Sequence, residues 1–206
     1  TLGDAIFLKF TWQDELDEEF QQKMYNSSIR DELTDAYSRS YLLEQMRSEM
    51  SYAERHDAGL TLVFLDIDRF KHVNDTHGHV AGDRVLIRLA DLIRSAIREE
   101  DLFARYGGEE FAILVRETAL ADVEEMADRI RQSVADLVFE DDDGDEFSVT
   151  VSAGIAPYDS ETMAETDDWL RAADEAMYLA KDAGRNCVRI HRTALDFDGD
   201  VYDTLQ

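Results

Sequence analysis

Carboxylate side chains stand at two places in the chain where an apolar, strand-like segment meets a turn. The segment LTLVFLD at 60–66 ends in Asp66 and is followed by Asp68, while the stretch RYGGEEF carries Glu109 and Glu110 directly after two glycines. Carboxylates that converge from neighbouring strands repel each other unless a cation lies between them. Mg²⁺ suits such oxygen-only ligation, because it accepts one or two carboxylates, keeps several waters and takes further oxygens from a substrate phosphate. These residues therefore predict a site for a divalent cation and a phosphate-bearing ligand.

Gly107 and Gly108 separate two strand-like segments, 102–106 and 109–115. Two glycines accept the positive φ angles of a two-residue hairpin turn, so we expect the turn at this pair. They also let a phosphate chain approach the backbone closely, and Lys71, just beyond the first strand, is placed to neutralise phosphate charge. Each signal has an ordinary alternative, since a Gly-Gly hairpin is often only a turn and an aspartate at a strand end often caps a helix. Their combination at this spacing favours a metal and nucleotide site.

Alternating helical and extended patterns indicate which elements position these side chains. Beyond the strands already named, helices are predicted at 40–57, 80–98, 120–138 and 168–182, and strands at 147–155 and 186–191. Without the additional helices the order is β-α-β-β-α-β, which predicts an α/β (α+β) fold with a ferredoxin-like, palm-type sheet and helices on one face. In such a sheet the first strand lies centrally beside the hairpin, so we expect Asp66 next to Glu109.

The composition is globular and strongly acidic. Among the 206 residues, 44% are hydrophobic, and 47 Asp plus Glu against 21 Lys plus Arg give a formal net charge of −26. Such a charge repels polyanions, so we expect no nucleic-acid partner and no contact with an anionic membrane. No apolar run approaches the length of a membrane span, and the single cysteine, Cys187, fits a reducing compartment. We therefore expect a cytoplasmic location.

Three segments are expected along the chain. Residues 1–28 are interpreted as the tail of an upstream domain followed by a linker helix, 29–192 as the main domain, and 193–206 as an acidic C-terminal tail. The linker helix is indicated by apolar residues every four positions: Trp12, Leu16, Phe20 and Met24. Such a helix suits dimerisation or signal relay, and packing on its own domain is the alternative. Because the chain lacks an initiator Met, we expect it to be a fragment of a longer protein.

Five separated motifs closely resemble the GGDEF family, the diguanylate cyclases. They are DELTDAYSR, FLDIDRFKHVNDTHGHVAGD, RYGGEEF, SAGIA and AMYLAKDAGRN, in the order in which the family carries them, within about residues 29–192. The resemblance implies an enzyme that condenses two GTP into cyclic di-GMP and two pyrophosphates. It also implies Mg²⁺ as cofactor, with two ions per active half-site and Mn²⁺ as a substitute. Because one such domain holds one GTP, the active species is expected to be a homodimer.

The same resemblance implies the catalytic and metal-binding residues. Asp66 and Glu109 would bind the metal through their carboxylates, with the backbone carbonyl of Ile67 as a further ligand. Glu110 is implied as a third catalytic residue. As the neighbour of Glu109 on a strand, however, Glu110 is expected to point to the opposite face, so a structural or partner-site role competes with catalysis.

The implied nucleotide contacts divide into base and phosphate ligands. Asn74 and Asp83 would contact guanine. Asp83 suits that base because its carboxylate accepts hydrogens from guanine N1 and the exocyclic amine, whereas adenine N1 presents a lone pair. The residues implied to hold or lie against the phosphates are Lys71, Lys181, Arg185, Gly107 and Gly108.

A second feature of the family is the sequence Arg98-Glu-Glu-Asp101, which ends five residues before GGEEF. In relatives an RxxD at this spacing marks an inhibitory site for the product, cyclic di-GMP, and Arg129 on the following helix would add a further contact. The alternative is an ion pair at i, i+3 on a helix end, which stabilises little at a surface. Arg129 is explained equally well as a solvated helical arginine.

Some features stay open or carry no catalytic prediction. The alternative to an enzyme is a catalytically silent module that binds GTP or cyclic di-GMP; degenerate members typically lose the turn acid or the strand-end Asp, and both are present here. The opening motif has Asp35 where the family usually has Gly, which puts the local turn geometry in doubt. The acidic turn at 141–146 is interpreted as a solvated surface, and His77 as a packing or surface residue.

Overall fold

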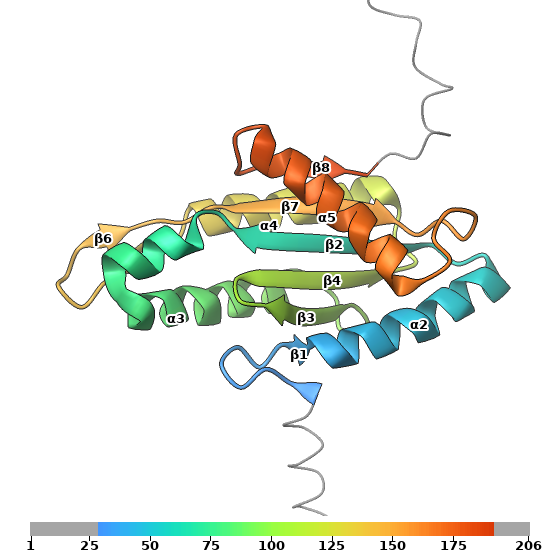
Figure 1. Cartoon of the computed structure of the whole chain (residues 1–206), viewed down its shortest axis with the longest axis horizontal. Coiled ribbons are helices and arrows are strands. Elements are labelled where there is room, and N and C mark those ends of the chain that lie inside the picture. Colours follow the sequence, from blue (N-terminus) through green and yellow to red (C-terminus); the bar gives the residue numbers. More distant parts are fainter. Residues whose placement is uncertain (1–28, 192–206) are drawn as a thin grey trace, which may run out of the picture.

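Residues 29–191 are described by a computed structural model (Figure 1). The helix expected within residues 1–28 and the acidic tail expected at 193–206 lie outside the described residues. Within 29–191, no helix combines the length and the apolar character needed to cross a membrane.

The expected β-α-β-β-α-β core is present, with additional elements before, within and after it. The elements are β1 (Tyr37–Ser38), α2 (Arg39–His56), β2 (Leu60–Ile67), α3 (Phe70–Ala96), β3 (Leu102–Gly107), β4 (Glu110–Arg116), α4 (Leu120–Ala135), β5 (Phe139–Glu140), β6 (Glu146–Phe147), β7 (Val151–Pro157), α5 (Thr166–Asp182) and β8 (Val188–Ile190).

The central sheet has six strands in the order β1-β3-β4-β2-β7-β8. β2 pairs antiparallel with β4 on one side and with β7 on the other. All eight residues of β2 are buried, as expected for a strand covered on both faces. The predicted position of the first strand beside the hairpin is confirmed.

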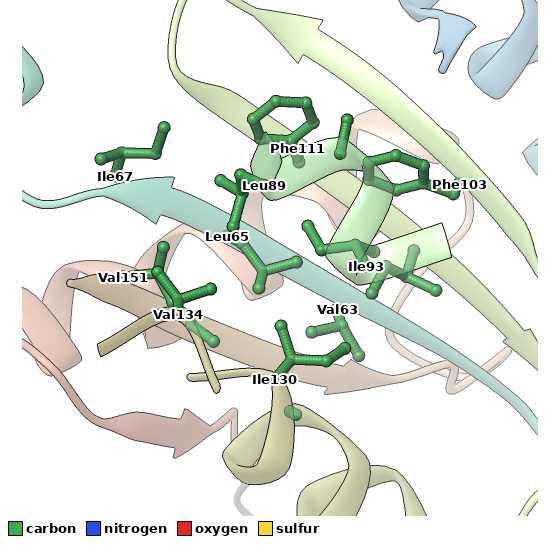
Figure 2. Close-up of a cluster of buried hydrophobic side chains, with 14 of the residues drawn as sticks. Val63, Leu65, Ile67, Leu89, Ile93, Phe103, Phe111, Ile130, Val134 and Val151 are labelled. Carbon is green, nitrogen blue, oxygen red and sulfur yellow. The ribbon is translucent and has the colours of Figure 1, made fainter. Parts of the chain in front are cut away.

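Side chains of β2 alternate between two hydrophobic clusters, one on each face of the sheet. Val63, Leu65 and Ile67 belong to the cluster covered by α3 and α4, while Leu62 and Phe64 belong to the cluster covered by α2 and α5. Figure 2 shows the first cluster, in which β2 meets Leu89 and Ile93 of α3 and Ile130 of α4. The two core helices thus share one face as predicted, and the additional helices α2 and α5 cover the other (Figure 1). Burying each apolar side chain of this size stabilises the fold by about 1.5–3 kcal/mol.

Most element boundaries lie within a few residues of the sequence prediction, and two differ by more. The strand expected at 147–155 begins at Val151, and residues 139–147 instead form a separate two-stranded hairpin, β5–β6. The helix expected at 80–98 begins at Phe70 and is broken at Gly78, whose φ of 83° and ψ of 160° are not helical. Its first segment, FKHVNDTH, buries only Phe70 and Val73, so the apolar periodicity that would indicate a helix there is weak.

β7 and α5 approach each other closely at Gly154. A Cβ at this position would lie 2.1 Å from the carbonyl oxygen of Ala173 and 2.3 Å from the backbone nitrogen of Met177. Both atoms belong to the backbone of α5, so they cannot move without moving the helix.

We therefore expect Gly154→Ala to lower the free energy of unfolding by about 2–3 kcal/mol, as overpacked cores do. The matched control is Gly59→Ala, because a Cβ there meets nothing within 4 Å among the described residues. Urea denaturation of both variants measures the difference. Equal stabilities would contradict the close approach of α5 to β7.

Candidate active site

The β3–β4 hairpin turns at Gly108 and Glu109. Gly107 pairs with Glu110 across the hairpin, so the two-residue loop lies one position later than predicted. Of the two glycines, Gly108 alone has a positive φ, at 42°. The prediction of a Gly107–Gly108 turn was wrong because the irregular register between Arg105 and Gly107 takes up one residue before the turn. Glu109 therefore lies in the turn, and Glu110 is the first residue of β4.

Asp66 lies directly opposite Glu110 in the antiparallel pairing of β2 and β4. Opposed residues of such a pair project from the same face of the sheet, and here that face is the one covered by α5, because Lys181 of α5 contacts Asp66. The expectation that Glu110 points away from the site was wrong, since alternation along a strand does not extend into the turn that holds Glu109. Glu109 is held beside β2 by a hydrogen bond from the backbone nitrogen of Ile67 to its carbonyl oxygen, at 3.3 Å.

The three carboxylates create a local excess of negative charge. Asp66 is 7% exposed, and its Oδ2 lies 2.8 Å from Lys181 Nζ. Burial raises the pKa of Asp66 in spite of Lys181, and the charges of Glu109 and Asp68 raise it further. Burial also raises the pKa of Glu110, with the neighbouring charge of Asp66 as the next cause. The positive charge of Lys181 alone therefore does not balance the negative charge of the three carboxylates.

The donor set fits a divalent cation that arrives with a phosphate ligand. Among residues 29–191, no group of three or more acidic, histidine or cysteine side chains is arranged to hold a metal ion by itself. Asp66 and Glu109 supply carboxylate oxygens, and Ile67, whose side chain is buried in the core, has only its backbone to offer. Mg²⁺ commonly binds through one or two carboxylates, waters and substrate phosphates, so it does not require a closed protein cage.

Asp68 has a different role from Asp66, although the sequence places them together. Its carboxylate accepts hydrogen bonds from Thr150 Oγ1 at 2.6 Å, Ser152 Oγ at 2.7 Å and the backbone nitrogen of Asn186 at 3.1 Å. Asp68 thus ties β7 and the loop after α5 to the end of β2. That loop carries Arg185, which lines a cavity of about 320 Å³ between the start of α3 and the residues before β7.

The break in α3 brings Asn74 against Gly82, the residue that precedes Asp83. In a continuous helix, residues 74 and 82 would lie about 12 Å apart along the axis. Here Gly82 packs on Asn74 so closely that a Cβ at Gly82 would be 2.0 Å from Asn74 Oδ1. Asp83, the next residue, is exposed, as is Lys71 in the first turn of α3. Each segment of the broken helix therefore carries an exposed polar side chain, and the two segments pack together at Asn74 and Gly82.

Asp31 and Arg105, which stand in the motifs DELTDAYSR and RYGGEEF, position the turn, a role that the sequence alone did not reveal. Arg105 donates to the carbonyl oxygen of Gly108 from Nε at 3.0 Å and Nη2 at 2.7 Å, while its Nη1 contacts both carboxylate oxygens of Asp31 at 3.0 and 3.1 Å. Asp31 also accepts hydrogen bonds from the backbone nitrogen and hydroxyl of Thr34. Asp35 adopts a φ of 54°, a left-handed conformation that aspartate tolerates better than most residues. The opening motif DELTDAYSR therefore braces the glycine turn.

The residues predicted for product inhibition surround a second cavity, of about 250 Å³, which includes Arg98, Asp101 and Arg129 in its lining. Asp101 is 9% exposed. Its Oδ2 accepts a hydrogen bond from the backbone nitrogen of Arg98 at 3.1 Å, and its Oδ1 has no partner within the described part of the chain. The guanidinium of Arg98 instead donates from Nη1 to Thr118 Oγ1 at 3.2 Å. Arg98 therefore does not form the alternative i, i+3 ion pair with Asp101. Burial raises the pKa of Asp101.

A β-α-β-β-α-β sheet with acidic residues at the end of its central strand and in the adjacent hairpin fits the class of domains that bind a cation together with a phosphate-bearing ligand. Within that class, residues 28–187 match the family described as "Diguanylate cyclase, GGDEF domain". The chain belongs to the GGDEF family.

Named relatives agree with this assignment. The chain is 40% identical over 165 residues to the response regulator PleD of Caulobacter vibrioides, which covers 78% of this chain and 36% of PleD. It is 37% identical over 163 residues to the diguanylate cyclase DgcP of Pseudomonas aeruginosa, and this match covers 79% of this chain and 24% of DgcP. A solved structure of DgcB from Caulobacter crescentus contains its coiled coil and GGDEF domain in complex with c-di-GMP. This structure superimposes on the chain with a TM-score of 0.81 at 29% identity, and the match covers 85% of this chain and 92% of the DgcB chain. The chain thus spans less than half the length of these curated relatives.

The brace on the turn can be tested through stability. We expect a double-mutant cycle with Arg105→Gln and Asp31→Asn to give a coupling energy of about 1 kcal/mol in urea denaturation at neutral pH. Burial raises the pKa of Asp31, but the hydrogen bonds from Thr34 and Arg105 outweigh it and lower that pKa below 3.8. The coupling should therefore be complete above about pH 4 and decline as the pH falls through the lowered pKa.

The exposed pair Arg30–Asp35, at 3.6 Å, provides the control cycle with Arg30→Gln and Asp35→Asn. Exposed pairs contribute little, so a coupling for Arg105 and Asp31 no larger than that of the control would contradict the brace.

Proposed function

We propose that this chain is a diguanylate cyclase domain, which joins two GTP molecules into cyclic di-GMP and releases two pyrophosphates. The observation that carries the proposal is the convergence of Asp66, Glu109 and Glu110 beside a glycine turn, where burial and mutual repulsion raise the pKa of Asp66 and Glu110. Such a site favours a bound cation together with a triphosphate. Membership of the GGDEF family supports the same reaction.

The reaction joins the ribose 3′-hydroxyl of one GTP to the α-phosphate of another. Asp66, Glu109 and the carbonyl of Ile67 would hold Mg²⁺, with two ions per half-site and Mn²⁺ as a substitute. When bound, the metal would supply a Lewis acid that lowers the pKa of the hydroxyl and stabilises the departing pyrophosphate. Glu110 lies beside Asp66 on the same face, so we assign it to this carboxylate group. Positioning of the reactants supplies most of the rate in such chemistry.

The remaining contacts hold the nucleotide. Asn74 and Asp83, on the two segments of α3, would bind the guanine edge. Phosphate oxygens would be held by three cations and approached by two glycines: Lys71, Lys181, Arg185, Gly107 and Gly108. Lys181 supports this assignment directly, because its ammonium group already lies at the carboxylates, 2.8 Å from Asp66.

The second GTP must come from a second copy of the domain. One set of base and phosphate ligands holds one nucleotide, so the two nucleotides would face each other across a homodimer. The helix expected within residues 1–28 would set how the two copies meet.

The cavity at the RxxD sequence is proposed to bind cyclic di-GMP and to inhibit the enzyme. Asp101 is only 9% exposed, yet its Oδ1 has no hydrogen-bond partner within residues 29–191. Buried acceptors rarely stay unpaired. The N1–H and amino groups of guanine are donors of the required kind. Arg98 and Arg129 line the same cavity and would contact the phosphates.

The reaction is tested by incubating the protein with GTP and Mg²⁺, at several protein concentrations, and separating the products by chromatography. We expect cyclic di-GMP to form at a rate that rises more than linearly with protein concentration. Asp66→Asn and Glu109→Gln should each lower turnover by more than about 100-fold, beyond what loss of a group that only orients a metal ligand costs.

The control for these two variants is Glu44→Gln, which removes an exposed carboxylate on α2 and should leave turnover unchanged. Absence of product from the wild-type chain, even in an enforced dimer, would favour a silent GTP or cyclic di-GMP binding module. Preferential use of ATP would contradict the role of Asp83.

Product inhibition is tested by binding of cyclic di-GMP in calorimetry and by its effect on the initial rate. We expect Arg98→Ala to weaken binding by about 10- to 100-fold, the loss of a charge-assisted hydrogen bond, and to relieve inhibition. Arg47→Ala, an exposed arginine on α2, is the control. If Arg98→Ala binds cyclic di-GMP with unchanged affinity, the proposal that this cavity mediates product inhibition is contradicted.

A further inference from the structure

The acidic segment 139–147 packs against the broken helix α3, although the sequence suggested a solvated turn. It forms the hairpin of β5 and β6, apart from the central sheet, and Figure 1 shows it beside the bend of α3. His77 Nδ1 and Asp141 Oδ2 lie 2.8 Å apart, with 19% and 9% of their side chains exposed. This acidic residue is therefore largely withdrawn from solvent.

Asp141 joins the fold of the hairpin to the helix. Its Oδ1 accepts hydrogen bonds from the backbone nitrogens of Asp143 at 3.0 Å and Asp145 at 2.9 Å, while its Oδ2 contacts His77. The His77 ring stacks on Phe147, with the ring centroids 4.0 Å apart and the planes inclined by 11°. One carboxylate thus shapes the acidic turn and holds the residue that precedes Gly78.

The same hairpin also contacts α3 beyond the break. Arg84 Nη1 donates to the carbonyl oxygen of Glu140 at 3.1 Å, and the Arg84 guanidinium forms an ion pair with Asp142. Arg88 donates to the carbonyl oxygen of Val138 at 3.1 Å. Val138, Glu140 and Asp142 therefore contact the second segment of α3. Asp141 and Phe147 contact the first.

A hinge at Gly78 would separate the two predicted guanine ligands. Asn74 precedes the break and Asp83 follows it, and Gly78 has a φ of 83°, a conformation that suits glycine and interrupts the helical ladder. The angle between the segments must then be fixed by contacts other than helical hydrogen bonds. The packing of Gly82 on Asn74 gives one such contact, and the hairpin bridges both segments.

We propose that the hairpin 139–147 is a brace for guanine recognition. Through His77 and Asp141 on one side of Gly78, and Arg84 on the other, it fixes the angle at which Asn74 and Asp83 meet the base. His77, Asp141 and Arg84 are positioning residues, because they act through α3. Such preorganisation increases affinity without adding contacts to the ligand. The inference rests on the proposed function, since it assigns guanine to this part of α3.

The test uses the whole chain and the variants His77→Phe and Arg84→Ala, alone and combined. His77→Phe keeps an aromatic ring against Phe147 and removes the contact with Asp141. We expect the KM for GTP to rise by roughly tenfold in each single variant, less than the hundredfold that a misplacement of about 1 Å can cause, with kcat changed less than twofold. Asp143→Asn, at an exposed position of the same turn, is the control and should leave KM unchanged.

Two further readouts separate positioning from general destabilisation. Inosine triphosphate lacks the exocyclic amine of guanine, so a misplaced Asp83 should distinguish it less well from GTP; the ratio of the two KM values should fall towards one. Hydrogen–deuterium exchange should become faster at residues 72–84, with the exchange of β2 unchanged.

The outcomes distinguish this inference from the proposed reaction. Product formation by the wild-type chain with unchanged KM and base preference in His77→Phe and Arg84→Ala would overturn the brace and leave the reaction intact. If the wild-type chain forms no product, calorimetric titration with GTP replaces KM. Weaker GTP binding in both variants would then support the brace, and equal or absent binding would overturn it.

Discussion

The pairing of Asp66 with Glu110, beside Glu109 in the turn, is the constraint on which the site depends. The register of β2 and β4 holds these carboxylates together against their repulsion, and burial raises the pKa of Asp66 and of Glu110 because a buried charge is poorly solvated. Packing on both faces of β2 opposes the repulsion. A rigid sheet thus keeps an uncompensated negative site, and a cation with its phosphate ligand is what such a site favours.

The parts around this pairing are held by acidic residues that serve the fold. Asp31 holds Arg105 against the carbonyl of Gly108, and Asp68 ties the loop that carries Arg185 to β7. Asp141 in turn connects the β5–β6 hairpin to α3. The acidic residues behind the net charge of −26 therefore do not all lie free on a solvated surface, since several of their carboxylates accept hydrogen bonds from specific donors.

α3 combines two requirements that a regular helix could not meet. Its second segment must bury Val85, Leu89 and Ile93 against the sheet, while its first must turn back so that Asn74 lies against Gly82. The break at Gly78 reconciles the two. A break, however, leaves the angle between the segments to contacts other than helical hydrogen bonds, which links the proposed guanine site to a hairpin about 60 residues later in the chain.

The sequence by itself determined the order of the core elements, the helices α2, α4 and α5 to within a few residues, and the chemical character of the site. These follow from local periodicity and from residue types at short spacing, as in LTLVFLD and RYGGEEF. The tertiary structure decided that the turn falls at Gly108–Glu109, that Glu110 faces Asp66, that Arg105 meets Asp31, and that His77 meets Asp141. Strand register and contacts between distant residues settle these matters, because a shift of one residue reverses the face on which a side chain lies.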